Sequence, residues 1–397
     1  MMRKYIISAF SALLCLSACV YEPEQFVEPD SDSTGESSNT SSDIGSVFAI
    51  NEGKQICNPS VSQDTVNYPG SLLWLNFGGK LNVPAPDSIY TTSRVIQHDR
   101  LTVSDKSNKV LWYLMRDVEA GECQFQDPEW STHANFIVAL RAYDTKNSTN
   151  CESLDYGIFA VRMQDKKKFW FYDKNIREEA TPHVWVSPDA KVDTTADAST
   201  IEGFFGTKDV RLVYVNSKDE IVFVDLSSGD LKKAISAAKI LKKPEGVSGW
   251  LMDSPLISPD GNFVVYNMIN TNMIEWSSYV QELSESSAPV KLETVKGMMS
   301  APVQPHWFKK GESLFVTWAE FPMGAQFVNK NDLTNPSVQG GSAGRTSMRE
   351  VSLEAGSAPK FVGDVASLAP IPMIGGVSPD GKFLATGTNY AYVLQLP

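Results

Sequence analysis

The sequence lacks an apolar run of transmembrane length after its first residues, and it has only four histidines and five cysteines in 397 residues. Without such a run, we expect no segment to span a membrane. The sequence also lacks a serine nucleophile elbow, a phosphate loop, a zinc-ligand spacing and an EF-hand loop. We therefore expect no cofactor and no metal, and the sequence favours a protein without enzymatic activity.

Positive charge is scarce as well. The formal net charge is −12, from 35 Lys and Arg against 47 Asp and Glu. This balance argues against nucleic acid or anionic lipid as a general partner. Hydrophobic residues make up 42% of the chain, which is typical of a globular protein with a large core.

Residues 1–18 have the pattern of a secretory signal. Arg3 and Lys4 precede a short apolar core, Ile6 to Leu14, which is too short for a stable membrane span. Leu16-Ser17-Ala18-Cys19 resembles the lipobox of bacterial lipoproteins. The resemblance implies cleavage before Cys19 and diacylglycerol on its thiol. A plain signal peptide with an incidental cysteine is the alternative.

The lipobox resemblance also suggests where the protein resides. It implies a protein held to the bacterial cell envelope by its lipid anchor only. Val20 stands where an aspartate would retain a lipoprotein at the inner membrane in well-studied Gram-negative systems, and this favours the outer membrane over the inner.

Residues 19–45 predict a disordered, acidic and Ser-rich tether after the modified cysteine. The stretch from Glu36 to Ser42 contains no residue that can support a core. A flexible chain of this length reaches about 25–30 Å, enough to lift a folded domain off a membrane.

Three further cysteines are candidates for disulfides, because the expected export permits oxidation. Cys123 with Cys151 is the favoured pair, since their spacing fits neighbouring strands. Cys57 can replace either partner in an alternative pairing.

A repeated turn indicates the fold. Ser258-Pro259-Asp260-Gly261 and Ser378-Pro379-Asp380-Gly381 each precede an apolar, strand-forming segment. Proline presets φ near −65° and glycine supplies a positive φ, so Pro-Asp-Gly predicts a tight turn between strands. Degenerate copies occur at residues 128–131, 183–189 and 305–308. Their spacing is typical of propeller blades with insertions.

The repeat resembles the TolB-type propeller family, whose inner strand reads Pro-x-Trp-Ser-Pro-Asp-Gly, over about residues 125–397. The resemblance implies an all-β propeller over residues 46–397. It implies nothing about role or partners, because TolB has a separate N-terminal α/β domain in place of the tether.

We expect six blades, or seven if Ser71–Leu75 belongs to a blade of its own. Ser46–Ile50 is the candidate closing strand beside the C-terminal Tyr392–Leu396, because an open edge would promote aggregation. In Leu231–Lys243 we expect an outer strand and then a short helix.

Residues just before the inner strands should line the mouth of a central channel. They include His183, Asp253, Gln304 and His306, which form either a ligand site or inert polar lining. Trp250 and Trp276 fall in predicted loops and are candidates for stacking on a sugar. Trp130, Trp185 and Trp307 lie in the repeated motif, and we expect them in the core.

The sequence therefore predicts a monomeric, lipid-anchored propeller that binds an envelope protein or a glycan without catalysis. The alternative is a propeller enzyme of the polysaccharide lyase or glycosidase type, with its site at the channel mouth. Fold alone does not choose between them.

Overall fold

The structure, a computed structural model, consists of short antiparallel strands that form six sheets among the residues it describes. These residues are 46–50, 56–76, 98–117, 119–145, 151, 153–247, 249–251, 255–270, 275–284, 286–292, 300–322, 347–354, 357–364, 374–386 and 392–395. The signal, Cys19 and the tether lie outside this set. No helix within it is long and apolar enough to cross a membrane.

The sheets follow one another along the chain, and each is listed here from its inner to its outer strand. Sheet 1 contains β2 (Ile56–Val61), β3 (Leu72–Asn76), β4 (Arg100–Ser104) and β5 (Val110–Met115). Sheet 2 contains β6 (Glu122–Trp130), β7 (Phe136–Asp144), β8 (Leu154–Arg162) and β9 (Lys168–Ile176). Sheet 3 contains β10 (His183–Val186), β11 (Val210–Val215), β12 (Ile221–Asp225) and β13 (Lys239–Ile240).

The second half of the chain repeats the arrangement. Sheet 4 has an inner strand in two pieces, β14 (Gly249–Leu251) and β15 (Leu256–Ile257), followed by β16 (Phe263–Asn270), β17 (Glu275–Glu282) and β18 (Val290–Lys291). Sheet 5 contains β19 (Ser300–Lys310), β20 (Ser313–Pro322), β21 (Ser347–Ser352) and β22 (Lys360–Asp364). Sheet 6 contains β23 (Ile374–Val377), β24 (Phe383–Thr386) and β25 (Tyr392–Gln395), with β1 (Ser46–Ala49) outermost.

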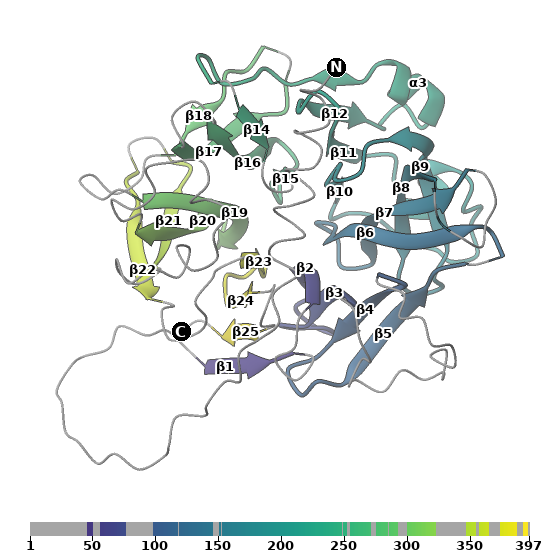
Figure 1. Cartoon of the computed structure of the whole chain (residues 1–397), viewed down its shortest axis with the longest axis horizontal. Helices are drawn as coiled ribbons and strands as arrows, with labels where there is room; N and C mark the ends of the chain where they lie inside the picture. Colours follow the sequence, from purple (N-terminus) through teal and green to yellow (C-terminus); the bar gives the residue numbers. More distant parts are fainter. Residues whose placement is uncertain are drawn as a thin grey trace.

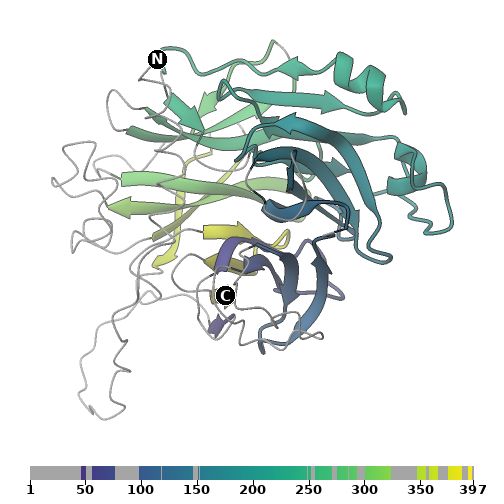
Figure 2. The same cartoon turned by 45° about the vertical axis from the view of Figure 1, so that its right-hand side comes forward.

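The sheets are arranged radially around a centre, as Figure 1 shows, with the inner strands nearest the middle. Each inner strand contacts the inner strand of the next sheet, and β23 of sheet 6 contacts β2 of sheet 1. Figure 2, turned by 45°, shows the first strands of the chain (purple) next to its last strands (yellow). The chain is an all-β propeller, as the spaced turns predicted.

The N-terminal strand closes the array. β1 pairs with β25 from Ser46 opposite Gln395 to Ala49 opposite Tyr392. Ile50, directly after β1, is fully buried against sheets 1 and 6. The predicted closing strand is thus confirmed. Ser71–Leu75 does not form a sheet of its own, because β3 pairs with β2 and β4 within sheet 1.

The Pro-Asp-Gly turns fit against aromatic rings of the preceding sheet. Gly261 has φ +76°, and a Cβ there would lie 2.6 Å from Trp185 Cε2. Trp185 also donates from Nε1 to the carbonyl of Pro259 at 3.0 Å. Gly381, φ +69°, lies against Phe308 in the same way. The glycine therefore serves both the turn and the contact between sheets.

The core lies between the sheets, and the motif tryptophans belong to it. Trp130, Trp185 and Trp307 are all buried, as predicted. An aromatic cluster joins sheets 2 and 3 through Phe204 and Phe205 of the short helix α2 (Ile201–Phe205).

The segment from Leu231 to Lys243 reverses the predicted order. It begins with the helix α3 (Leu231–Ser236), and the outer strand β13 follows. Asp230 caps the helix, because its side chain accepts a hydrogen bond from the backbone N–H of Lys233 at 3.1 Å. This N-cap explains why the helix begins directly after the turn.

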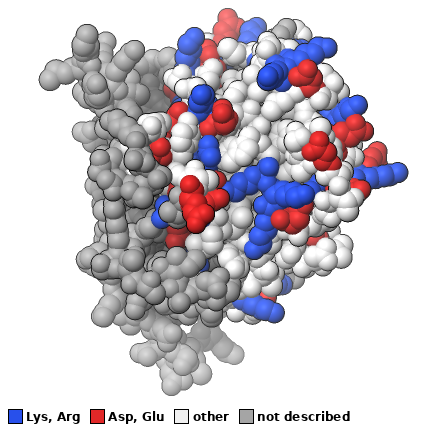
Figure 3. All heavy atoms as spheres, turned by 90° about the vertical axis from the view of Figure 1, so that its right-hand side faces the viewer, with Lys and Arg blue, Asp and Glu red and all other residues white. Residues whose placement is uncertain are grey.

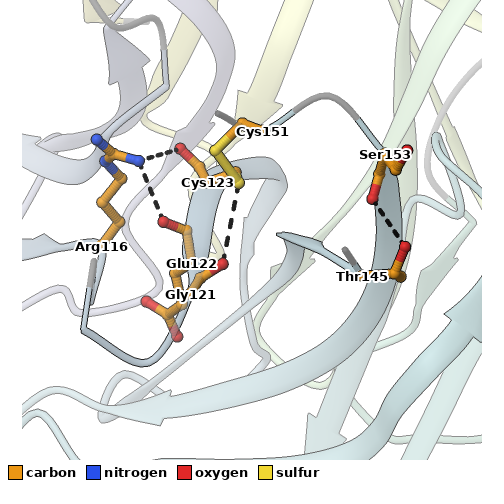
Figure 4. The surroundings of a disulfide bond; sticks show 7 residues. All are labelled: Arg116, Gly121, Glu122, Cys123, Thr145, Cys151 and Ser153. Carbon is orange, nitrogen blue, oxygen red and sulfur yellow. Dashed lines mark hydrogen bonds between the residues drawn. A yellow bond between two sulfur atoms is a disulfide. The ribbon is translucent and has the colours of Figure 1, made fainter. Parts of the chain in front are cut away.

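A disulfide joins Cys123 of β6 to Cys151, the pair favoured from the sequence. Figure 4 shows Arg116 beside it, where the guanidinium donates to the carbonyls of Glu122 and Cys123 at 3.1 and 3.0 Å. The bond spans 28 residues, a loop whose closure stabilises the fold by about 3–4 kcal/mol in the chain-entropy model.

Candidate functional site

A polar residue followed by proline recurs where the inner strands approach the centre. The four copies are Asn58-Pro59-Ser60, Asp127-Pro128-Glu129, Thr181-Pro182-His183 and Gln304-Pro305-His306. Proline has no N–H to donate to the ladder, so it favours a bulge. The strand pairings of β2, β6 and β19 accordingly shift register at the Pro positions. The motif places a polar residue at equivalent positions of sheets 1, 2, 3 and 5.

Asp127 connects three of these sheets. Its Oδ1 accepts a hydrogen bond from Asn58 Nδ2 of sheet 1 at 2.7 Å. Its Oδ2 accepts one from the backbone N–H of Thr181, before sheet 3, at 3.2 Å. The side chain is buried, and this burial raises the pKa of the carboxyl to about 6.

Glu129 lies two residues further along β6. It accepts hydrogen bonds from the hydroxyl of Ser60 and from the backbone N–H of Trp130. Burial nevertheless raises its pKa to about 8. The same Ser60 hydroxyl accepts from the backbone N–H of Trp130 at 3.1 Å, so the pair ties sheet 1 to sheet 2.

Glu179 completes a group of three carboxyls with raised pKa values. Its pKa rises to about 7, because of burial first and of the nearby charge of Asp127 second. Arg177 lies 3.6 Å from it and opposes this rise. Side chains with such shifts are enriched in functional sites, so Asp127, Glu129 and Glu179 are the strongest chemical candidates among the described residues.

The backbone around Asp127 is strained. Asn58, Asp127, Glu179 and Thr181 all have positive φ, at 46°, 44°, 62° and 41°. Residues other than glycine adopt this region at a cost of about 1–3 kcal/mol each, and such residues persist where the surroundings hold them in place. The hydrogen bonds of Asp127 with Asn58 and Thr181 help to stabilise these backbone conformations.

His183, a predicted mouth residue, is buried at the start of β10. Its Nδ1 accepts a hydrogen bond from the backbone N–H of Ile257 in β15 at 3.0 Å. Burial, and next the charge of His306, lower its pKa to about 3. The ring is therefore neutral at physiological pH and fastens sheet 3 to sheet 4.

The other predicted site residues are distributed as follows. His306 lies in β19, close enough to His183 to affect its pKa. Gln304 lies at the bulge of the same strand, and Asp253 lies outside the described residues.

Trp250 and Trp276 lie in strands β14 and β17, so their predicted place in loops was wrong. The reason is that β16 and β17 pair as far as Asn270 and Glu275, which makes their hairpin longer than the sequence pattern indicated. Trp250 is opposite Ile269, and Ile269 is opposite Trp276. The structure thus aligns the two tryptophans in one row across sheet 4.

Within the part of the chain that the structure describes, no three His, Cys, Asp or Glu residues are grouped as metal ligands. The three carboxyls with raised pKa values were absent from the predicted site. Only Asp127 had a signal in the sequence, the recurring polar residue before proline, because Glu129 follows that proline and Glu179 lies outside the motif.

Comparison with known proteins identifies no family for this chain. No family model matches the chain. A search of curated proteins finds no match. Similar solved structures include Kuenenia stuttgartiensis hydrazine synthase, which is 12% identical over 85% of this chain and 74% of that chain, with a TM-score of 0.42.

Two more similar structures are an oligogalacturonate lyase and a propeller domain. The lyase, from Vibrio parahaemolyticus, is 11% identical over 87% of this chain and 79% of that chain, with a TM-score of 0.42. The β-propeller domain of the Trilobed protease from Pyrococcus furiosus is 12% identical over 85% of this chain and 78% of that chain, with a TM-score of 0.35.

Proposed function

We propose that this protein is a lipid-anchored propeller of the bacterial envelope that binds an envelope glycan or protein without catalysis. The observation that carries the proposal is that Asp127, Glu129 and His183 are already engaged in hydrogen bonds between the sheets. Each of them accepts a hydrogen bond from a neighbouring sheet or from the segment leading to it. Side chains that fasten the sheets together are unavailable for proton transfer to a substrate unless those bonds break.

The proposed ring has six blades, one for each sheet, and carries its ligand on the face where the inner strands begin. Trp250 and Trp276 lie in one row at that end of sheet 4. Tryptophan offers a large apolar ring with one donor, which suits stacking on a sugar or on a partner side chain.

The anchor model draws on the position of β1. Ser46 begins the outermost strand of sheet 6, so residues 19–45 would join the ring at its rim. A lipid on Cys19 would then hold the ring within about 25–30 Å of the outer membrane and let it reorient. We propose that the protein acts there as a monomer.

The surface charge is consistent with a partner other than nucleic acid. Figure 3 shows acidic and basic side chains interspersed on one side of the molecule. Lys168 pairs with Glu122, and Lys208 pairs with Glu202 at 3.1 Å. Nucleic-acid binding usually requires a surface in which positive charge dominates.

Titration of the purified protein with plant and bacterial polysaccharides tests the binding function. We expect binding without release of products, and at least a tenfold weaker affinity in Trp250→Ala and Trp276→Ala. Trp74→Phe, at a buried position of sheet 1, is the matched control and should bind as the wild type does. Release of unsaturated or reducing sugar products would reject a purely binding role.

Incorporation of radiolabelled palmitate tests the anchor. We expect label in the wild type and none in Cys19→Ala, while Cys57→Ala should label normally. Equal labelling of wild type and Cys19→Ala would contradict the anchor.

A propeller enzyme of the lyase or glycosidase type is the second candidate, favoured by the raised pKa values of Asp127 and Glu179. The charge of Asp127 helps to keep Glu179 protonated, and acid–base catalysis uses such unequal pairs. If this candidate is correct, Asp127→Asn and Glu179→Gln should each lower product formation at least a hundredfold without changing ligand affinity. No product from the wild type on the polysaccharide panel would reject it.

A further inference from the structure

A recess opens between sheets 3 and 4, and residues of both sheets line it. Its empty volume is about 210 Å³, which includes space open to solvent. Pockets for cofactors and drug-sized ligands usually have about 300–1,000 Å³, so this recess suits a single side chain better than a whole small molecule. The lining residues are Asp219, Ile221, Leu241, Lys242, Lys243, Pro244, Tyr266, Met268 and Gln281.

The recess lies at the end of the two sheets where the inner strands begin. β11 runs antiparallel to β10, so the turn after β11, which contains Asp219, lies beside the start of β10. The segment from Leu241 to Pro244 leads from β13 toward Gly249, the first residue of β14. This is the end of the ring at which the proposed function places the ligand.

The walls of the recess are largely apolar. Ile221, Leu241, Tyr266 and Met268 all belong to the buried cluster that joins sheets 3 and 4. Each of them is less than a tenth exposed, so the shape of the recess is set by well-packed side chains. An apolar group that enters the recess exchanges contact with water for contact with these side chains, which favours its binding.

Gln281, the amide in the lining, is already engaged. Its Nε2 donates to the carbonyls of Lys242 and Ser287, each at 3.1 Å. Its Oε1 accepts a hydrogen bond from the Tyr266 hydroxyl at 3.0 Å. Both N–H groups of the amide are therefore used, and none is left to donate to the hydroxyls of a sugar. The walls favour an apolar side chain over a carbohydrate.

A basic segment forms one side of the recess. Residues 231–243 contain five lysines and no acidic residue, in a chain whose net charge is −12. Lys239, Lys242 and Lys243 are all exposed, and none of them forms an ion pair with a residue that the structure describes. Lysines elsewhere do so, as Lys168 does with Glu122. The basic segment is therefore unmatched within the described parts of the chain.

The carboxylate of Asp219, also in the lining, does not offset this charge. The Arg177 guanidinium lies 2.5 Å from Asp219 Oδ1 and pairs with it. A lysine on a short edge strand protects that edge from pairing with other chains, and this accounts for Lys239 of β13. Lys242 and Lys243 follow the strand, so edge protection does not account for them. An anionic partner does.

Apolar side chains are exposed beside the lysines. Ile240 of β13 is 53% exposed, and Val290 of β18 is 65% exposed. The Gln281 amide bridges the carbonyls of Lys242 and Ser287, so the segments next to these two outer strands are adjacent. Protein–protein interfaces combine an apolar centre with a charged and polar rim. The surface around the recess has this composition.

The place of the recess in the ring favours a protein over a lipid surface. Figure 1 shows β12 and α3 of sheet 3 across the ring from β1. The proposed tether joins the ring at β1, so a membrane that holds the anchor would lie on the β1 side. The outer edge of sheet 3 would then face away from that membrane.

We propose that the recess and Lys239–Lys243 form a docking site for an acidic segment of a partner protein, which inserts one aliphatic side chain between sheets 3 and 4. The proposal rests on the protein form of the proposed function. The inserted side chain packs on Leu241 and Met268, and carboxylates beside it pair with Lys242 and Lys243. The buried anchor supplies most of the affinity, while the charges set orientation and the rate of association.

Binding of synthetic peptides to the whole protein tests the proposal. The probe is a short fluorescein-labelled peptide of Asp and Glu with one leucine at its centre, and a second peptide has alanine in place of the leucine. Fluorescence anisotropy gives the affinities. We expect the leucine peptide to bind about tenfold more tightly, because the recess buries the larger side chain. Its affinity should fall as salt rises, because salt screens exposed charges.

Two charge-reversed variants locate the binding. Lys242→Glu/Lys243→Glu should weaken binding of the leucine peptide at least about tenfold. Lys232→Glu/Lys233→Glu is the matched control, because these lysines of α3 are also exposed but do not line the recess. It should leave the affinity nearly unchanged. In spectra of methyl-labelled methionine, the Met268 signal, assigned with Met268→Leu, should shift with the leucine peptide and not with the alanine peptide.

Two results would overturn the site itself. Equal weakening by the two double variants would show that net charge attracts the peptide without a specific site. Equal affinity for the leucine and alanine peptides, with an unmoved Met268 signal, would show that the recess takes no anchor.

Further results would assign the surface elsewhere. Binding to phosphatidylglycerol vesicles and not to the peptides, lost in Lys242→Glu/Lys243→Glu, would assign the lysines to a lipid surface and reject the proposal. No peptide binding by a wild type that binds polysaccharide would reject the docking site and keep the glycan form of the proposed function. Binding of neither peptides nor polysaccharides would reject both.

Discussion

At the scale of single residues, the centre of this propeller is held by buried titratable groups. Asp127, Glu129 and Glu179 have raised pKa values, whereas that of His183 is lowered. A carboxyl with a raised pKa binds its proton more tightly in the folded state. Stability from this source is therefore present at low pH and is lost as pH rises through the folded pKa.

The histidine has the opposite effect, because its folded form resists protonation. Its contribution is complete above its unfolded pKa of about 6.5 and is lost as pH falls toward 3. Between about pH 4.5 and 6.5 a rise in pH lowers stability through the carboxyls and raises it through His183, so the two effects oppose each other. Above pH 6.5, the carboxyls are the ones among these four groups whose charge still changes in the folded state.

We predict that the protein loses stability from pH 6.5 to pH 8.5 and that Glu129→Gln removes much of this loss. The amide keeps the shape of the side chain but carries no charge at high pH, so the variant should be more stable than the wild type at pH 8.5. Urea unfolding across this pH range measures it. Exposed Glu312→Gln is the control, and an identical pH profile for Glu129→Gln and wild type would contradict the prediction.

At the scale of elements, the hairpin turn and the neighbouring sheet depend on each other. The turn at Gly261 contacts Trp185 and accepts a hydrogen bond from the Arg211 guanidinium. Arg162 of sheet 2 similarly links this sheet to sheet 3. Its buried guanidinium donates hydrogen bonds to the carbonyls of Asp193, Gly203 and Phe204. Hairpins and insertions here join sheets as well as strands.

We predict that Gly261→Ala destabilises the protein by about 2–4 kcal/mol, from backbone strain together with overlap with Trp185. Gly311→Ala is a matched control, because Gly311 also occupies a hairpin turn with positive φ but has nothing within 4 Å of a new Cβ. It should cost only about 1–2 kcal/mol. Urea unfolding compares the two, and equal losses would show that the contact with Trp185 contributes nothing.

At the scale of the whole molecule, the short strand β1 closes the circular array of sheets. β1 covers the edge of β25. The Lys106 ammonium of the β4–β5 hairpin lies over the rings of both Phe48 of β1 and Phe383 of sheet 6, with Nζ 4.8 and 4.9 Å from the ring centroids. Sheets 1 and 6 are thereby joined at both the strand edge and the surface.

We predict that a chain starting at residue 51 is less stable by at least about 3 kcal/mol than one starting at residue 46, because it loses the β1 pairing and the buried Ile50. Its open edge should also promote aggregation. Thermal unfolding and size-exclusion chromatography of the two chains test this. Equal melting temperatures would contradict a role of β1 in closure.

Sequence alone determined the fold class, the closing strand, the buried motif tryptophans and the favoured disulfide pair. These follow from local rules: Pro-Asp-Gly requires a turn, alternating apolar residues form strands, and an open edge needs a partner. Only the tertiary structure decided that Asp127 bridges three sheets and that His183 bonds to Ile257. These hydrogen bonds join residues 54 to 74 positions apart in the sequence, and no local pattern specifies them.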